Sequence, residues 1–154
     1  MPDLKTADVR CAEYEFSILI NASVQRVWKG LTGQLSSWWL PDFHMLGPDS
    51  LVTLEPRAGG RLFEQNGASE LLWYTVLAIS PEVSLDLAGY CTADFGGPST
   101  TLLSIRLATE KTGTRLTIRD SLLGHVTDGH AESLRSGWKQ LFTEGLKYFV
   151  EKQA

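Results

Sequence analysis

The chain has 154 residues, a length typical of one domain with a substantial core. Apolar residues make up 43% and charged residues 21%, as in an ordinary globular protein. The net charge of −4 and the absence of a Lys/Arg cluster argue against nucleic-acid binding. No apolar run approaches the roughly 18 residues that span a bilayer, and residues 1–10 contain no apolar segment of a secretory signal. We therefore expect a cytoplasmic protein that neither inserts into a membrane nor binds nucleic acid.

The N-terminal part of the sequence predicts a tail, one strand and two short helices. Residues 1–12 are polar and lack periodicity, which predicts a flexible tail before a single domain over residues 13–154. An apolar, β-rich run over Tyr14–Ile20 predicts the first strand. Apolar residues at helical spacing follow a capping Ser23 and predict a helix that ends at Gly33. A second brief helix is predicted over Gln34–Trp39, before a proline.

The middle of the chain predicts a series of antiparallel strands separated by turn residues. These strands are expected at Leu51–Leu54, Arg61–Gln65, Leu71–Ile79, Ser84–Tyr90, Thr101–Ala108 and Thr114–Asp120. In the last of them Leu116 and Ile118 share one face, while Arg115, Thr117 and Arg119 share the other. This alternation is typical of a strand with one buried and one solvated face.

From Gly129 to the end, the apolar residues recur at helical spacing. They form one stripe, made of Leu134, Trp138, Leu141, Phe142, Leu146 and Phe149. The sequence thus predicts an α+β protein in which a curved antiparallel sheet of six to seven strands wraps around this long C-terminal helix. A twisted sheet around a single helix rarely closes completely, and we expect a pocket in the gap between them.

An ordered set of short motifs resembles the START-like (SRPBCC, helix-grip) superfamily. Within it, the chain is most similar to the branch named for homologues of the activator of heat-shock-protein-90 ATPase. The matching residues are Ile20-Asn21-Ala22, Val27-Trp28, Trp38-Trp39, Glu55 to Arg61, Ser80-Pro81, Gly113 to Thr117 and Ser136-Gly137-Trp138. The resemblance covers about Tyr14 to Glu151 and implies the helix-grip fold with its pocket. It does not imply an activity, because members range from lipid carriers to cyclases to co-chaperones.

Large apolar side chains provide the predicted wall of this cavity. They are Trp38, Trp39, Phe63, Trp73, Tyr90, Phe95, Leu103, Trp138 and Phe142. Tryptophan and phenylalanine bury much apolar surface, and such a set suits an apolar ligand. Simple core packing is the alternative, especially for the helical residues Trp138 and Phe142. No residue of the set predicts a particular reaction.

The charged residues near the strands give no convincing catalytic constellation. Glu64 follows Phe63, so an inward Phe63 places Glu64 on the outer face, and we interpret both Glu64 and Asp120 as solvated. A carboxyl group inside an apolar cavity would instead have a raised pKa and serve as a general acid. Arg61 and Tyr74 complete the candidates for such chemistry.

The histidines and cysteines show no metal-binding or disulfide spacing. His125 and His130 are five residues apart, which does not place them on one helix face, and His44 lies in a predicted loop. Cys11 and Cys91 are expected to be free thiols. We therefore predict neither a metal site nor a cofactor.

Three functions remain open at this stage. The first is a non-catalytic protein that binds a hydrophobic small molecule, such as a lipid or polyketide, in the cavity. The second is an enzyme of the polyketide cyclase or aromatase type, which requires two polar groups to converge inside the pocket. The third is a co-chaperone-like regulator of a heat-shock ATPase. That role belongs to larger proteins with an additional N-terminal domain, so we expect no chaperone partner. A homodimer through an exposed edge strand is a further possibility.

Overall fold

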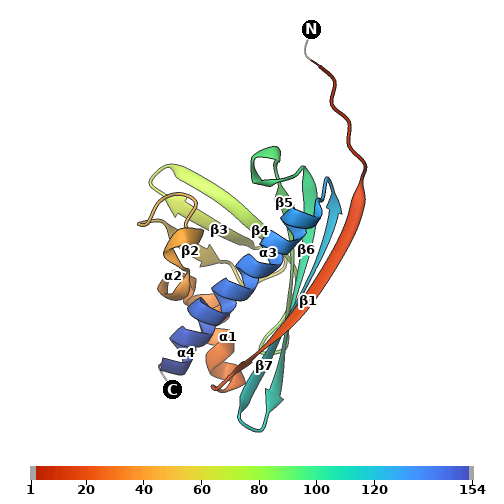
Figure 1. Ribbon diagram of the computed structural model, residues 1–154. Helices are drawn as coiled ribbons and strands as arrows, with labels where there is room; N and C mark the ends of the chain where they lie inside the picture. Colours follow the sequence, from red (N-terminus) through yellow and green to blue (C-terminus); the bar gives the residue numbers. More distant parts are fainter. Residues whose placement is uncertain (1–2, 153–154) are drawn as a thin grey trace.

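A seven-stranded antiparallel sheet curves around one long C-terminal helix in the computed structural model, which describes residues 3–152 (Figure 1). The strands are β1 (Arg10–Ile20), β2 (Leu51–Leu54), β3 (Arg61–Asn66), β4 (Ser69–Ser80), β5 (Ser84–Cys91), β6 (Ser99–Glu110) and β7 (Gly113–Gly124). Their order across the sheet is β1-β7-β6-β5-β4-β3-β2, so β1 and β2 form its edges. The predicted α+β helix-grip architecture is confirmed.

The helices come from two separate parts of the chain. After β1 follow α1 (Val24–Gly33), α2 (Leu35–Trp38) and the 3-10 turn η1 (Pro41–Phe43); a second 3-10 turn, η2 (Ala93–Phe95), joins β5 to β6. The C-terminal helix consists of α3 (Asp128–Gln140), the π-helical stretch η3 (Leu141–Lys147) and α4 (Tyr148–Lys152). Within residues 3–152, no helix is both long and apolar enough to cross a membrane.

The first strand begins earlier than the sequence pattern predicts. Arg10 pairs with Gly124 and Cys11 with Leu123, so residues 10–12 are part of the sheet and not of the predicted tail. The apolar pattern begins only at Tyr14, because Arg10 to Glu13 form the end of an edge strand, where Arg10, Cys11 and Glu13 are exposed and Ala12 is half-buried. Pairing with β7, and not local propensity, therefore sets this boundary.

The C-terminal helix covers the inner face of the sheet (Figure 1). It begins at a cap in which the Thr127 hydroxyl accepts a hydrogen bond from the His130 N–H at 3.0 Å. Its buried stripe contains Trp138, Phe142 and Leu146. These residues pack against the inner residues of β1, β5, β6 and β7, which together form one continuous hydrophobic core.

A glycine allows the C-terminal helix to lie close to α2. A Cβ atom on Gly145 would lie 2.5 Å from the Trp38 carbonyl oxygen, closer than non-bonded atoms approach. Gly137, on the preceding α3, has only an ordinary contact at 3.7 Å, to the Phe43 ring. The close approach at Gly145 places α2 and the adjacent Trp39 against the middle of the C-terminal helix.

Candidate functional site

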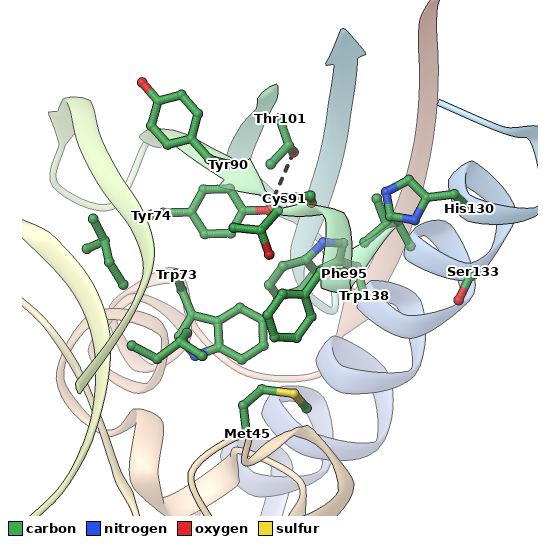
Figure 2. A pocket seen from close by; sticks show the side chains of 14 residues that line it. Met45, Trp73, Tyr74, Tyr90, Cys91, Phe95, Thr101, His130, Ser133 and Trp138 are labelled. Atoms are coloured by element: carbon green, nitrogen blue, oxygen red, sulfur yellow. Dashed lines mark hydrogen bonds between the residues drawn. The ribbon is translucent and has the colours of Figure 1, made fainter. Parts of the chain in front are cut away.

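A cavity of about 320 Å³ lies between α3, η2 and one end of the sheet (Figure 2). It is lined by Met45, Leu71, Leu72, Trp73, Tyr74, Tyr90, Cys91, Thr92, Phe95, Thr101, His130, Ser133, Leu134 and Trp138. Its volume is near the lower end of the range for small-molecule sites, roughly 300–1,000 Å³. None of these described lining residues is a lysine, arginine, aspartate or glutamate, so the wall is apolar with a few uncharged polar groups.

One side of the cavity wall is formed by residues on a single face of α3. His130, Leu134 and Trp138 follow one another at intervals of four residues, which places them on one face of α3. The opposite side comes from the sheet, where the antiparallel β4, β5 and β6 bring Tyr74, Cys91 and Thr101 to the same end. Strand pairing thus brings residues that are distant in the sequence to one side of the cavity.

Trp138 is the centre of an aromatic cluster beneath the cavity. Its ring centroid lies 5.8 Å from those of Tyr74 and Phe142, 6.2 Å from that of Trp73 and 6.3 Å from that of Trp39. The Phe142 pair is stacked, those with Trp39 and Trp73 are edge-to-face and that with Tyr74 is tilted, at separations that favour aromatic pairs. Trp73, Tyr74 and Trp138 of this cluster line the cavity and form its aromatic wall.

A buried polar network lies behind the Tyr74 side of the cavity. The carboxylate of Asp120 accepts hydrogen bonds from the Thr101 hydroxyl at 2.5 Å and from the Tyr14 hydroxyl at 2.6 Å. The Tyr74 hydroxyl lies 3.5 Å from the Thr101 hydroxyl. Burial raises the pKa of Asp120 above its ordinary value, although the hydrogen bonds from Thr101 and Tyr14 oppose this effect. Burial likewise raises the pKa of Tyr74, which keeps its phenol protonated.

Glu64 forms a second buried polar cluster, on the β3 side of the cavity. One carboxylate oxygen accepts from the Met45 N–H and the Trp73 indole N–H, both at 3.1 Å; the other accepts from the Leu46 N–H and the Ser50 hydroxyl, both at 2.7 Å. Burial acts to raise the pKa of Glu64, but these hydrogen bonds outweigh it and hold the pKa below its ordinary value. The ionised carboxylate therefore holds this loop in place, with Met45 at the rim of the cavity.

The prediction that Glu64 and Asp120 are solvated is wrong. Both side chains are fully buried, whereas Phe63 is half-buried on the opposite face, with the Arg61 guanidinium 4.1 Å from its ring centroid. The hydrophobicity of Phe63 suggested the wrong face for β3. Leu62 and Glu64 share the inner face instead, because four hydrogen-bond donors offset the cost of burying the carboxylate.

The nine residues predicted for the cavity wall divide into three groups. Trp73, Tyr90, Phe95 and Trp138 line the cavity, although Tyr90 is 74% exposed and turns away from it at the rim (Figure 2). Trp38, Trp39, Leu103 and Phe142 surround a separate void of about 20 Å³, large enough for about one water molecule. Phe63 contacts neither space and lies on the outer face. The structure therefore brings four of the nine residues to this cavity and places the other five elsewhere.

Several lining residues were not singled out from the sequence. His130 and Leu134 share the helical spacing of Trp138, which was sufficient to place them on the same face. Thr101 shares its strand face with Leu103, so alternation alone placed it inside. Met45 carried no such signal, because its position depends on the hydrogen bonds of its loop to Glu64.

The histidines occupy three separate environments. A ring nitrogen of His44 lies 2.7 Å from the Ser50 hydroxyl, and one of His125 lies 3.2 Å from the Gly97 carbonyl oxygen. His130 lines the cavity. Within residues 3–152, no three histidine, cysteine or acidic side chains come together in a way that suits a metal ion.

Comparison with known proteins gives the family of the chain. The model of the family described as Activator of Hsp90 ATPase homolog 1-like protein matches residues 21–151. The chain belongs to this family. The match covers strands β2 to β7 and nearly all of the C-terminal helix but not β1. It includes all the described residues that line the cavity, and it confirms the resemblance inferred from the motifs. No curated protein sequence matches the chain.

Solved structures with the same fold are distant in sequence. A protein from Mesorhizobium loti has 18% identity and a TM-score of 0.67, covering 93% of this chain and 99% of its own. A protein from Chromobacterium violaceum has 17% identity and a TM-score of 0.66, with coverage of 90% and 96%. DynU16, from the dynemicin biosynthetic locus, has 17% identity and a TM-score of 0.67, covering 90% of this chain and 47% of its own. At these identities the likeness shows the fold alone.

Proposed function

We propose that this protein binds a hydrophobic small molecule of lipid or polyketide type in the cavity between the sheet and α3. The observation that carries the proposal is the cavity itself, at about 320 Å³ with aromatic and aliphatic walls. Apolar surface at such a site stabilises a bound apolar molecule by roughly 25 cal/mol for each Å² removed from water. A cytoplasmic location and a homodimer remain predictions beside this one.

Blocking the cavity from an exposed helix position tests this proposal. Ser133 is exposed and lines the cavity, so Ser133→Trp places a large ring at its entrance without burying a polar group. Ser136 is exposed on the same helix and does not line the cavity, which makes Ser136→Trp the matched control. With the neutral fluorescent probe 1-aminoanthracene, we expect saturable binding that Ser133→Trp weakens at least tenfold and Ser136→Trp leaves unchanged. No saturable binding to the unaltered protein contradicts the proposal.

A cyclase or aromatase-type enzyme is the second candidate, supported by the chain of hydroxyl groups from Tyr74 through Thr101 to Asp120. Tyr74 and Thr101 line the cavity, and Asp120 lies directly behind them, so two polar groups converge on one side of the space. In such an enzyme Tyr74 would exchange a proton with a ketone substrate while Asp120 orients the hydroxyl network. Tyr74→Phe would then abolish turnover of a poly-ketone and retain its binding. Equal turnover by this variant contradicts the enzymatic alternative.

A further inference from the structure

The segment between η1 and β2 forms part of the cavity entrance. We call residues 44–50 of this segment the rim loop. Its Met45 side chain lines the cavity (Figure 2). The middle of the loop is held by β3, because the Glu64 carboxylate accepts hydrogen bonds from the N–H groups of Met45 and Leu46. The two ends of the loop are joined by a separate set of contacts, at His44.

His44 bridges the two ends of the rim loop. Its Nδ1 lies 2.7 Å from the hydroxyl oxygen of Ser50, the residue that directly precedes β2. Its Nε2 lies 3.2 Å from the carbonyl oxygen of Trp39, the residue that directly follows α2. The half-buried imidazole therefore ties the end of α2 to the start of β2 across the base of the loop.

Both of these oxygens act as acceptors toward His44. The pKa of Glu64 is held below its ordinary value, so the carboxylate is ionised and accepts the Ser50 proton at 2.7 Å. The Ser50 oxygen can then only accept from His44, and the Trp39 carbonyl has no proton to donate. Two acceptors that face two ring nitrogens require two N–H groups, which only the imidazolium form of histidine has. The geometry therefore fits a positively charged His44.

A neutral His44 loses one of these contacts, whichever nitrogen keeps the proton. With the proton on Nδ1, the lone pair of Nε2 faces the lone pairs of the Trp39 carbonyl oxygen. With the proton on Nε2, Ser50 must donate to Nδ1 and its proton is withdrawn from Glu64. Hydrogen bonds made by a charged group are also stronger than neutral ones. Loss of the proton therefore weakens the connection at the base of the rim loop.

The charged residues near His44 in the chain and across the sheet are all acidic. Asp42 belongs to η1 and Asp49 to the rim loop, and both are exposed; Glu64 faces His44 from β3 through the Ser50 hydroxyl. Neither α2 nor β2 contains a charged residue, and no lysine or arginine is present in η1 or the rim loop. These charges support the imidazolium form.

The three polar side chains do not form a hydrolytic triad. In such a triad the histidine lies between the nucleophile and the acid. Here Ser50 lies between His44 and Glu64, it is only 3% exposed, and its proton is used in the hydrogen bond to the carboxylate. The arrangement therefore acts on the position of the loop and not on a substrate.

We propose that His44 is a pH-sensitive latch on the rim loop, which holds the cavity entrance closed when the imidazole is protonated and lets it open when the proton is lost. Histidine ordinarily changes its charge between about pH 5 and 8, so the latch responds within this range. Exchange of a bound apolar molecule is then slow at acid pH and faster at neutral to alkaline pH. This consequence rests on the proposed binding function, whereas the latch itself does not.

Two measurements on the unaltered protein test the latch without a ligand. ¹⁵N NMR of the imidazole rings should show both nitrogens of His44 protonated at about pH 5.5 and one proton lost by about pH 8. Hydrogen exchange, corrected for the intrinsic effect of pH, should show that the Met45 and Leu46 amides open about tenfold more often at the higher pH. A neutral His44 at about pH 5.5, or a charge that stays constant over this range, overturns the proposal.

The release of 1-aminoanthracene, followed by stopped-flow fluorescence, tests the effect of the latch on the cavity. His44→Gln removes the titrating group, and His125→Gln is the matched control, because His125 contacts the Gly97 carbonyl and lies outside the rim loop. The buried Asp120 and the lining residue His130 remain in both variants. The unaltered protein and His125→Gln should release the probe at least about threefold faster at pH 8 than at pH 5.5, whereas His44→Gln should release it rapidly at both.

The outcomes separate the latch from the binding function. Equal release rates of the unaltered protein at the two pH values, or a pH dependence that survives in His44→Gln, overturn the latch and leave apolar binding in place. No saturable binding of the probe at either pH contradicts the proposed function, and the NMR and hydrogen-exchange measurements then decide on the latch alone.

Discussion

Replacing Glu64 by glutamine should destabilise the protein far more than its small change in shape suggests. The carboxylate accepts four hydrogen bonds at 2.7–3.1 Å, whereas a glutamine side chain has one acceptor oxygen and turns an NH₂ group toward the other two donors. Each buried donor left without an acceptor costs about 1–3 kcal/mol, and the Ser50 hydroxyl can turn to accept from the new amide. We therefore expect a loss of about 2–4 kcal/mol, or about 5–15 °C in melting temperature for a domain of this size.

Glu70→Gln is the matched control for this change. Glu70 is exposed on the neighbouring strand β4, where it lies 3.7 Å from Arg61, and its replacement should cost less than about 0.5 kcal/mol. Urea unfolding measures both variants, and hydrogen exchange should show faster exchange of the Met45 and Leu46 amides only in Glu64→Gln. Similar stability of the two variants would refute the assigned role of Glu64.

The pH dependence provides a second check on the Glu64 prediction. Its pKa in the folded protein is held below the ordinary value of 4.5, so its contribution to stability is fully present above that pH. The contribution is lost as the pH falls through the folded-state pKa. The stability difference between the unaltered protein and Glu64→Gln should therefore narrow at acid pH, and a difference that stays constant down to unfolding contradicts the lowered pKa.

Three further predictions concern other parts of the molecule. Burial raises the pKa of Asp120. The stability of the unaltered protein relative to Asp120→Asn should therefore be greatest below pH 3.8 and should decrease as the pH rises through the folded-state pKa. Urea unfolding at several pH values tests the direction of this change. Phe63→Ala should leave 1-aminoanthracene affinity unchanged, whereas Trp73→Ala should weaken it, and a larger effect at Phe63 would contradict the observed strand faces. Gly145→Ala should destabilise the protein by more than about 1 kcal/mol, because its Cβ would collide with the Trp38 carbonyl oxygen. Gly137→Ala should be neutral or stabilising. The melting temperatures of the two variants, measured by calorimetry, test this difference.

The fold could be predicted because its main signals are local. The alternation of Leu116 and Ile118 correctly gave the buried face of β7, and the helical stripe through Trp138 and Phe142 gave the C-terminal helix. The same alternation placed Asp120 on the buried face, two residues after Ile118. Its charge suggested solvent, but hydrogen bonds from sequence-distant hydroxyl groups make its burial tolerable.

The candidate site was predicted less completely because it depends on contacts between distant segments. Trp73 and Trp138, which were chosen from the sequence for their size and spacing, both line the cavity. The position of Met45 follows from the hydrogen bonds of its loop to Glu64, which no local pattern encodes. Trp38 and Trp39 were expected at the cavity, but α2 packs so closely on the C-terminal helix at Gly145 that these rings fill the core instead.

Native mass spectrometry of gently purified protein, with a denatured sample beside it, tests the central claim most directly. We predict an additional mass that disappears on denaturation, is absent from Ser133→Trp and is retained by Ser136→Trp. Its fragmentation should identify an apolar molecule, since the cavity walls are apolar. A mass equal to that of the polypeptide alone, together with no saturable binding of 1-aminoanthracene, would contradict the claim that this cavity holds a hydrophobic ligand.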